Sequence, residues 1–204
     1  RRVYGDLDYN TLASLFNLAN LHAIMGNPRL ALPLAEECLR GYRQTLGEEH
    51  QMTLTSMSQL SDVHDEMGNH DEALPLARRV LEAQRRTLGN EHVTTLMSVN
   101  RVALTLDEGL GDQEAALPLY EEDLRLSRRT LGDEHPETLM GLSNLGAVLC
   151  QLGRYGEGLP LLREALAGRR KVLGEDHSQT QQTIRALGVF EAAAPAVAAA
   201  EVVV

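Results

Sequence analysis

The chain has 204 residues, of which 43% are hydrophobic and 24% charged, a balance typical of a folded chain rather than a disordered one. No apolar run reaches the roughly 18 residues of a membrane helix, and the net charge of −10 argues against binding to nucleic acid or anionic lipid. The two cysteines are too few for a disulfide-stapled secreted scaffold, so we expect a reducing compartment and a cytoplasmic location.

Three short motifs recur in phase along the chain. The motif LGxxH begins at residues 42, 43 and 42 positions apart, namely Leu46, Leu88, Leu131 and Leu173. The motif ALPL, or GLPL in the last copy, begins at Ala31, Ala73, Ala116 and Gly158. A threonine follows each motif histidine by three residues, at Thr53, Thr95, Thr138 and Thr180. The markers indicate an internal repeat.

Each repeat is predicted to hold two helices, called helix A and helix B in chain order. In the second copy, helix A carries one stripe at helical spacing: Leu54, Met57, Leu60, Ser61, His64 and Met67. Gly68 and Asn69 end it, helix B runs from about Asp71 to Leu88, and Gly89 caps helix B. The array covers residues 1–190, with repeats at about 11–52, 53–94, 95–137 and 138–179 and a half repeat at 180–190.

Two irregularities are placed by the repeat. The extra residue of the third copy is expected in the turn at residues 109–112, where added length costs little. Gly5 and Thr11 lie 42 residues before Gly47 and Thr53, which indicates an earlier, degenerate copy. Each helix B also has a proline near its first turn that should not prevent the helix from forming: Pro33, Pro75, Pro118 and Pro160.

Charged residues keep the same period. Basic residues fall in the last turns of helix B, at Arg43, Arg85, Arg86, Arg128, Arg129, Arg169, Arg170 and Lys171. Acidic residues fill the loops before helix A, at Glu48, Glu49, Glu91, Asp133, Glu134, Glu175 and Asp176. Both positions match the helix dipoles, which favours a stabilising role, and the alternative is a charged ridge that docks a partner.

The helix pairs resemble the tetratricopeptide repeat, and the 42-residue period resembles its kinesin light chain type. The stretches closest to that type are LGDEHPET at 131–138 and LSNLG at 142–146. The resemblance covers about residues 3–190 and implies an all-α fold, a right-handed superhelical solenoid of helix-turn-helix repeats whose concave face is lined by helix A. The repeat type does not identify a kinesin as a partner.

The resemblance also implies a peptide-binding groove along the helix A positions that face away from helix B. Those positions hold Phe16, Asn17, Asn20, Ser58, Gln59, Asp62, Glu66, Met97, Asn100, Arg101, Leu104, Met140, Ser143 and Asn144. Asn17 and Asn144 stand where related repeats bind an extended peptide backbone, because an amide both donates and accepts. The alternative for these amides is an exposed polar residue without a ligand.

The charges of the groove favour one kind of ligand. Only Arg101 and Arg185 are basic there, so a clamp for a terminal carboxylate is not expected. Repeats two and three are acidic, through Asp62, Asp65, Glu66, Asp107 and Glu108. We therefore expect a protein or peptide partner with a basic or neutral-apolar segment.

No catalytic or metal site is expected. The chain has no P-loop, HExxH, GxSxG or CxxC motif. One zinc ion cannot be shared by the loop histidines of successive repeats, so a helix-capping role is expected for His50, His92, His135 and His177. His22 and His64 are predicted core residues, Cys38 is predicted in the core and Cys150 nearer the groove. No cofactor is expected.

The predicted function is a non-catalytic protein–protein interaction scaffold that binds a short linear peptide. Two alternatives remain open: a regulatory region of a larger enzyme or nucleotide switch, and a structural subunit of a large assembly. The Ala/Val-rich tail at residues 191–204 is predicted to be disordered, with a makeshift cap on the last repeat as the alternative.

Overall fold

The computed structural model describes residue 5 and residues 7–201, and the regular structure in this part of the chain is helical throughout. The elements are α1 (Tyr9–Ile24), α2 (Pro28–Leu46), α3 (Gln51–Glu66), α4 (His70–Thr87), α5 (Val93–Leu104), the π-helical turn η1 (Thr105–Gly109), α6 (Gln113–Leu131), α7 (Pro136–Gln151), α8 (Tyr155–Leu173) and α9 (Ser178–Glu201). The predicted all-α helical repeat solenoid is confirmed. None of the described helices combines the length and apolar character needed to cross a membrane.

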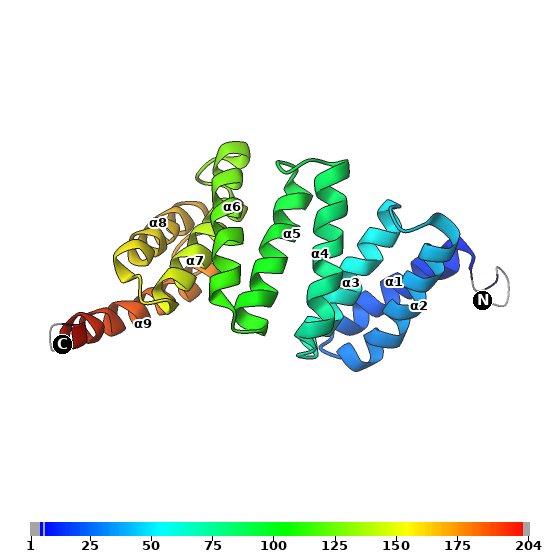
Figure 1. Ribbon diagram of the computed structural model, residues 1–204, viewed down its shortest axis with the longest axis horizontal. Coiled ribbons are helices and arrows are strands. Elements are labelled where there is room, and N and C mark those ends of the chain that lie inside the picture. The colour runs from blue at the N-terminus through cyan, green and yellow to red at the C-terminus, as the bar shows by residue number, and fades with distance from the viewer. Residues whose placement is uncertain (1–4, 6, 202–204) are drawn as a thin grey trace. The chain divides into compact units, whose positions relative to one another are not determined.

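The chain divides into two compact units. The first comprises residues up to 89 together with 104–110, and the second comprises residues 90–103 and those from 111 onward. In the first unit, α1 packs on α2, α2 on α3 and α3 on α4; in the second, α6 packs on α7, α7 on α8 and α8 on α9. Figure 1 shows the helix A and helix B hairpins of the first and fourth repeats as α1 with α2 and α7 with α8.

The loop between helix B and the next helix A explains the motif LGxxH. Gly47 ends α2 with a φ of 86°, a left-handed conformation that glycine adopts without steric cost. The hydroxyl of Thr53 donates to the carbonyl of Gly47 at 2.7 Å, which closes the loop. The predicted capping role of the loop histidines is confirmed, because Nδ1 of His50 accepts from the amide of Met52 at 3.1 Å. The same contact is made by His92, His135 and His177.

Helix B tolerates its internal proline. α4 spans His70–Thr87, one residue earlier at each end than predicted. Each internal proline is the sixth residue of its helix and leaves the helix continuous: Pro33, Pro75, Pro118 and Pro160. The cost is about one backbone hydrogen bond for each helix, as expected.

The extra residue of the third repeat lies inside helix A, so its predicted position in the turn is wrong. α3 has 16 residues, whereas α5 with 12 and η1 with 5 give 17. The turn that follows is three residues long in both repeats, at 67–69 and 110–112. A π-helical turn holds one residue more than an α-turn, and Leu110 accordingly donates its amide to the carbonyl of Thr105, five residues back, at 3.0 Å.

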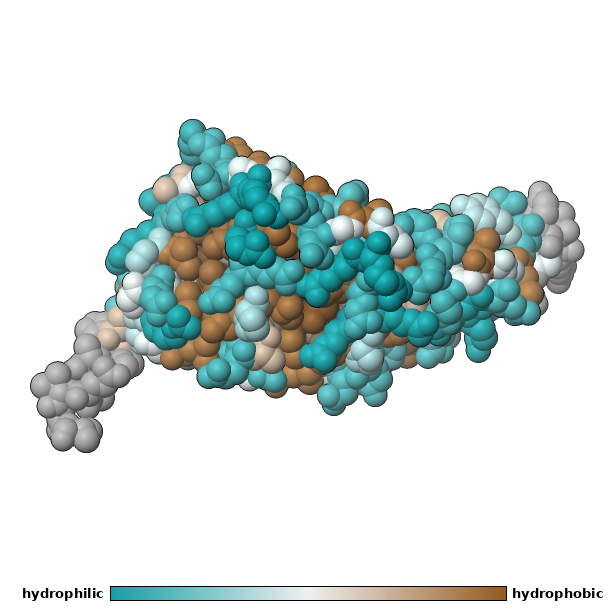
Figure 2. Space-filling model, turned by 45° about the horizontal axis from the view of Figure 1, so that its top comes forward, coloured by the Kyte–Doolittle hydropathy of each residue, from teal (hydrophilic) through white to brown (hydrophobic). Residues whose placement is uncertain are grey.

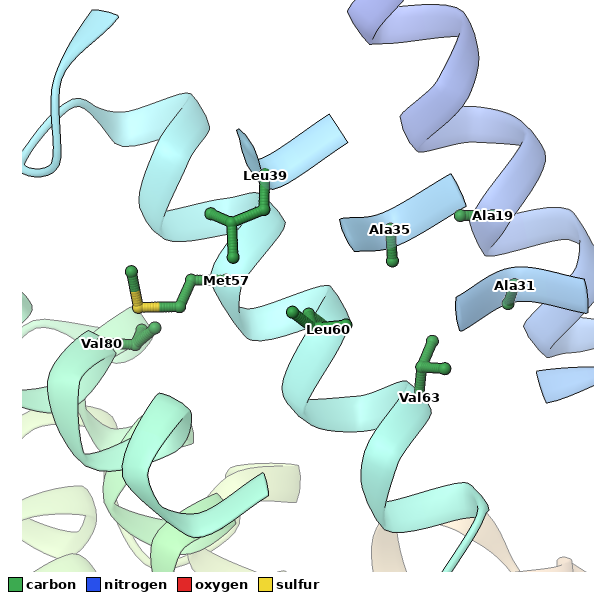
Figure 3. Close-up of a cluster of buried hydrophobic side chains, with 8 residues drawn as sticks. All are labelled: Ala19, Ala31, Ala35, Leu39, Met57, Leu60, Val63 and Val80. Carbon is green, nitrogen blue, oxygen red and sulfur yellow. The ribbon is translucent and has the colours of Figure 1, made fainter. Parts of the chain in front are cut away.

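Small residues let the helices of the first unit approach closely. One core cluster joins all four of its α-helices and consists of Ala19, Ala31, Ala35, Leu39, Met57, Leu60, Val63 and Val80. Figure 3 shows Met57 between Leu39 of α2 and Val80 of α4, and Val63 pointing toward Ala31. Successive repeats therefore share one continuous apolar interior, which is how a solenoid gains stability.

The last helix continues past the predicted end of the half repeat. The backbone of α9 is helical to Glu201, whereas the sequence predicted disorder from residue 191; residues 202–204 lie outside the described part of the chain. Two sequence features explain the difference. Alanine has the highest helix propensity, and residues 191–201 lack a glycine like those with positive φ that end helix A in the other repeats, at Gly26, Gly68, Gly111 and Gly153.

Candidate functional site

The structure places the candidate peptide-binding residues on helix A of both units. Those of the first unit, here called the first-unit face, are Phe16, Asn17, Asn20, Ser58, Gln59, Asp62 and Glu66. Asn17, Asn20 and Glu66 are exposed, whereas Gln59 is only 8% exposed. The side-chain amide of Gln59 donates to the carbonyl of Phe16 at 2.9 Å. This bond ties α3 to α1, and the sequence did not predict it.

Gln59 also leaves a buried acceptor unused. Its Oε1 atom is buried and has no hydrogen-bond partner among the described residues. A buried polar atom without a partner is costly, so this oxygen favours a site where an N–H group from a ligand or a water molecule completes the hydrogen bonding. The atom lies on the first-unit face, between α1 and α3.

The helical segments α1, α3 and η1, which carry and border the first-unit face, are acidic and lack lysine and arginine. α1, α3 and η1 contain no lysine or arginine, but α3 and η1 carry Asp62, Asp65, Glu66, Asp107 and Glu108. Asp65 is already bonded, because it accepts from the hydroxyl of Thr105 and contacts Nδ1 of His70, both at 2.9 Å. Glu66 and Glu108 are exposed. The view in Figure 2 shows hydrophilic side chains over much of the surface, with hydrophobic areas between them.

The candidate residues of the second unit, here called the second-unit face, are Met97, Asn100, Arg101, Met140, Ser143 and Asn144. Met97 is 51% exposed, and Asn100 is 6% exposed. The side-chain amide of Asn144 donates to Oδ1 of Asn100 at 2.8 Å, so these two amides join α7 to α5. Burial lowers the pKa of Arg101 from its usual value. This face offers sulfur and amide groups instead of a row of charges.

Three of the five candidate amides thus bond within the chain, and the other two, Asn17 and Asn20, are exposed. The Oδ1 atom of Asn144 takes no part in the bond to Asn100, and the Asn144 side chain is half-buried. Leu104, the remaining candidate, ends α5 and is half-buried. Peptide binding by these residues stays a prediction.

The periodic charges of the loops pair with one another. Arg86 donates to Glu49 of the preceding loop at 2.7 Å. Arg129 pairs with Glu91, and Lys171 with Glu134, in the same arrangement one and two repeats later. All six side chains are more than half exposed, so each pair contributes at most about 1 kcal/mol. These three pairs, here called the ion-pair ladder, join successive repeats in addition to the predicted matching of the helix dipoles. They engage charges that the alternative, a charged ridge that docks a partner, would need to be free.

The histidines and cysteines sort by burial. His22 and His64 are half-buried, and the Nδ1 atom of each has no hydrogen-bond partner among the described residues, so the expectation of satisfied core histidines is not met. Cys38 is fully buried, with Sγ 3.4 Å from the carbonyl of Leu12. Cys150 is 1% exposed and faces α8 rather than the groove, because a Cβ at Gly158 would lie 2.6 Å from its sulfur. Burial raises the pKa of both thiols.

Two further features concern metal binding and a surface hollow. Among the described residues, no three histidine, cysteine or acidic side chains lie close enough together to hold a metal ion. A hollow of about 520 Å³ is lined by Glu36, Leu39, Arg40, Arg43, Gln44 and Leu60. It lies largely against α2, away from the candidate residues of helix A, and its rim carries both signs of charge.

Sequence comparisons identify the repeat. A tetratricopeptide repeat model matches residues 10–86 and 66–128, and a second model of the same name matches residues 138–179. A search of curated protein sequences found no match.

Structure comparisons agree with the sequence models. The nearly identical TPR-like repeats assigned to a kinesin light chain of Podosopora anserina are 27% identical, with a TM-score of 0.75 over 88% of this chain and 84% of that chain. BtubC (BKLC) from P. vanneervenii is 21% identical, with a TM-score of 0.77 over 91% and 74%. A Rap protein complexed with Competence and Sporulation Factor is 12% identical, with a TM-score of 0.66 over 93% and 55%. The last two show a likeness of fold alone.

Proposed function

The chain belongs to the tetratricopeptide repeat family, with repeats of the kinesin light chain-like type, and we propose that it is a non-catalytic scaffold that binds a short linear peptide on helix A. Helix pairs of this kind leave one side of helix A free of helix B, so an extended segment can lie across several repeats. A Rap protein of similar fold was crystallised with Competence and Sporulation Factor, which supports a ligand-binding use of the fold.

The observation that carries the proposal is the charge of the first-unit face. Its helices hold carboxylates and no lysine or arginine, so a basic segment would be attracted and an acidic one repelled.

The test is binding of fluorescent basic, neutral and acidic peptides of equal length to the purified chain. We expect selective binding of basic peptides that weakens strongly between about 0.05 M and about 0.5 M salt, because exposed charges are screened. The double variant Glu66→Lys with Glu108→Lys should lower affinity roughly tenfold at low salt, since two attractions become repulsions. The matched control is the double variant Glu36→Lys with Glu82→Lys, which makes the same change of net charge at exposed positions on helix B of the same unit.

Two results would contradict the proposal. If a folded chain binds basic and acidic peptides equally, the charge of the first-unit face does not select the ligand. If the control with Glu36→Lys and Glu82→Lys weakens binding as much as the helix A double variant does, the peptide is held by the net charge of the chain and not by helix A.

A further inference from the structure

An acidic residue occupies a core position of α6. Asp123 is 3% exposed. The equivalent positions of helix B in the other three repeats hold residues without a charge, namely Cys38, Val80 and Ala165, and all three are buried. Asp123 therefore stands in a column of the repeat that is otherwise reserved for small apolar or thiol side chains.

The carboxyl of Asp123 lies between two repeats. A Cβ built on Gly141 of α7 would be 3.1 Å from Oδ2 of Asp123, so the carboxyl sits against the backbone of the next helix A. In the first unit, the equivalent pair is Cys38 and Ser56, whose side chains are 3.5 Å apart. The glycine in α7 gives the larger carboxyl its room.

No compensating charge is provided. Among the described residues, no lysine, arginine or histidine forms an ion pair with Asp123, and the charged groups that act on it are Glu137 of α7 and Glu122 of α6, both acidic. An ionised carboxylate at this position would be buried without a partner, which proteins avoid.

We propose that Asp123 makes the packing of α6 against α7 depend on pH. With a neutral carboxyl, the third and fourth repeats pack as in the structure. When the carboxyl ionises, it must draw in water or move outward, and either change loosens the α6–α7 junction.

The pKa of Asp123 places this change near neutrality. Burial first, and then Glu137 and Glu122, raise the pKa from 3.8 to about 7. The folded chain holds this proton more tightly than the unfolded chain does, so the contribution of Asp123 to stability is largest below pH 3.8, falls as pH rises to about 7 and is flat above it. Between about pH 5.5 and about pH 8.5, the folding equilibrium constant should fall about 30-fold through this residue alone.

The experiment compares urea unfolding of three chains at about pH 5.5 and about pH 8.5. The chains are the native one, Asp123→Asn and the control Glu121→Gln, which removes an exposed carboxyl of α6. All three keep the seven histidines, so their titration cancels in the comparison. We expect the native chain and Glu121→Gln to show the 30-fold fall in excess of Asp123→Asn. Equal pH dependence in all three chains would overturn the proposal.

Two further measurements keep the test decisive if Asp123→Asn folds poorly. The Asp123 carboxyl of the native chain, followed by carbon-13 NMR, should titrate with a midpoint near 7; a midpoint below about 5 overturns the proposal. Amide hydrogen exchange, corrected for the intrinsic pH effect, should lose protection in α6 and α7 but not in α1 and α2 as pH rises through 7. Loss that is uniform over all helices also overturns it.

Discussion

A close backbone contact between helices A and B of the fourth repeat yields a quantitative prediction. A Cβ at Gly158 of α8 would lie 2.5 Å from the carbonyl oxygen of Gly146, 2.6 Å from the sulfur of Cys150 and 3.0 Å from the amide of Cys150. Two of these atoms belong to the backbone of α7, so no side-chain rotation can relieve the overlap. The equivalent helix B positions hold Ala31, Ala73 and Ala116, which shows that the close approach is specific to the fourth repeat.

We expect Gly158→Ala to destabilise the chain. Forcing a methyl group into a filled contact costs about 1–3 kcal/mol, and the better helix propensity of alanine returns up to about 1 kcal/mol. The control is Gly156→Ala, two residues earlier in α8, where a Cβ would meet no atom within 4 Å. That variant gains the propensity without the overlap, so it should match or exceed the native chain in stability.

Urea unfolding followed by circular dichroism measures both variants. The difference between them isolates the overlap, since the propensity term is common, and it should be about 1–3 kcal/mol in favour of Gly156→Ala. If Gly158→Ala proves as stable as Gly156→Ala, then α7 and α8 do not approach as closely as described and the reasoning fails.

Three further predictions concern capping, the ion pairs and the thiols. His135→Ala should cost about 1 kcal/mol in urea unfolding because α7 loses its N-cap, and His135→Asn should recover most of it; no loss in the alanine variant would contradict the capping role. Arg86→Ala should change stability by less than about 1 kcal/mol, and high salt should erase the difference, since its partner Glu49 is 59% exposed. Cys38 and Cys150 are buried with raised pKa, so a thiol reagent should label them only in denaturant; fast labelling of the folded chain would refute their burial.

Local features of the fold followed from the sequence because each has a local cause. A glycine that ends helix B and a histidine that caps the next helix A act within a few residues, and their period revealed the repeat. The π-helical turn could not be found in this way, since Gly109 and Gly111 looked like turn residues while the extra residue was absorbed before them. The helical backbone of α9 beyond residue 190 is in keeping with alanine's helix propensity, whereas low complexity favoured disorder there.

The candidate site was predicted only in outline. The positions on helix A follow from the repeat, but Gln59 bonds the carbonyl of Phe16 and Asn144 bonds Asn100 across 43 and 44 residues of sequence. Such hydrogen bonds between repeats depend on how far a side chain reaches, so the spacing of the repeated motifs does not predict them. Asp123 could be found from the sequence, because comparing the four equivalent positions shows a single acid among uncharged residues.

The ion-pair ladder has a consequence for how such a chain can change in length. Each repeat presents a base near the end of its helix B and an acid in the loop that follows, and the base pairs with the acid of the preceding repeat, as in Arg129 with Glu91 and Lys171 with Glu134. The contact is head-to-tail, so removing or duplicating one whole repeat would rejoin an acid to a base at the new junction. Asp123 and the π-helical turn break this interchangeability, since both belong to the third repeat alone. A gain or loss of length would thus be tolerated most easily in the other repeats.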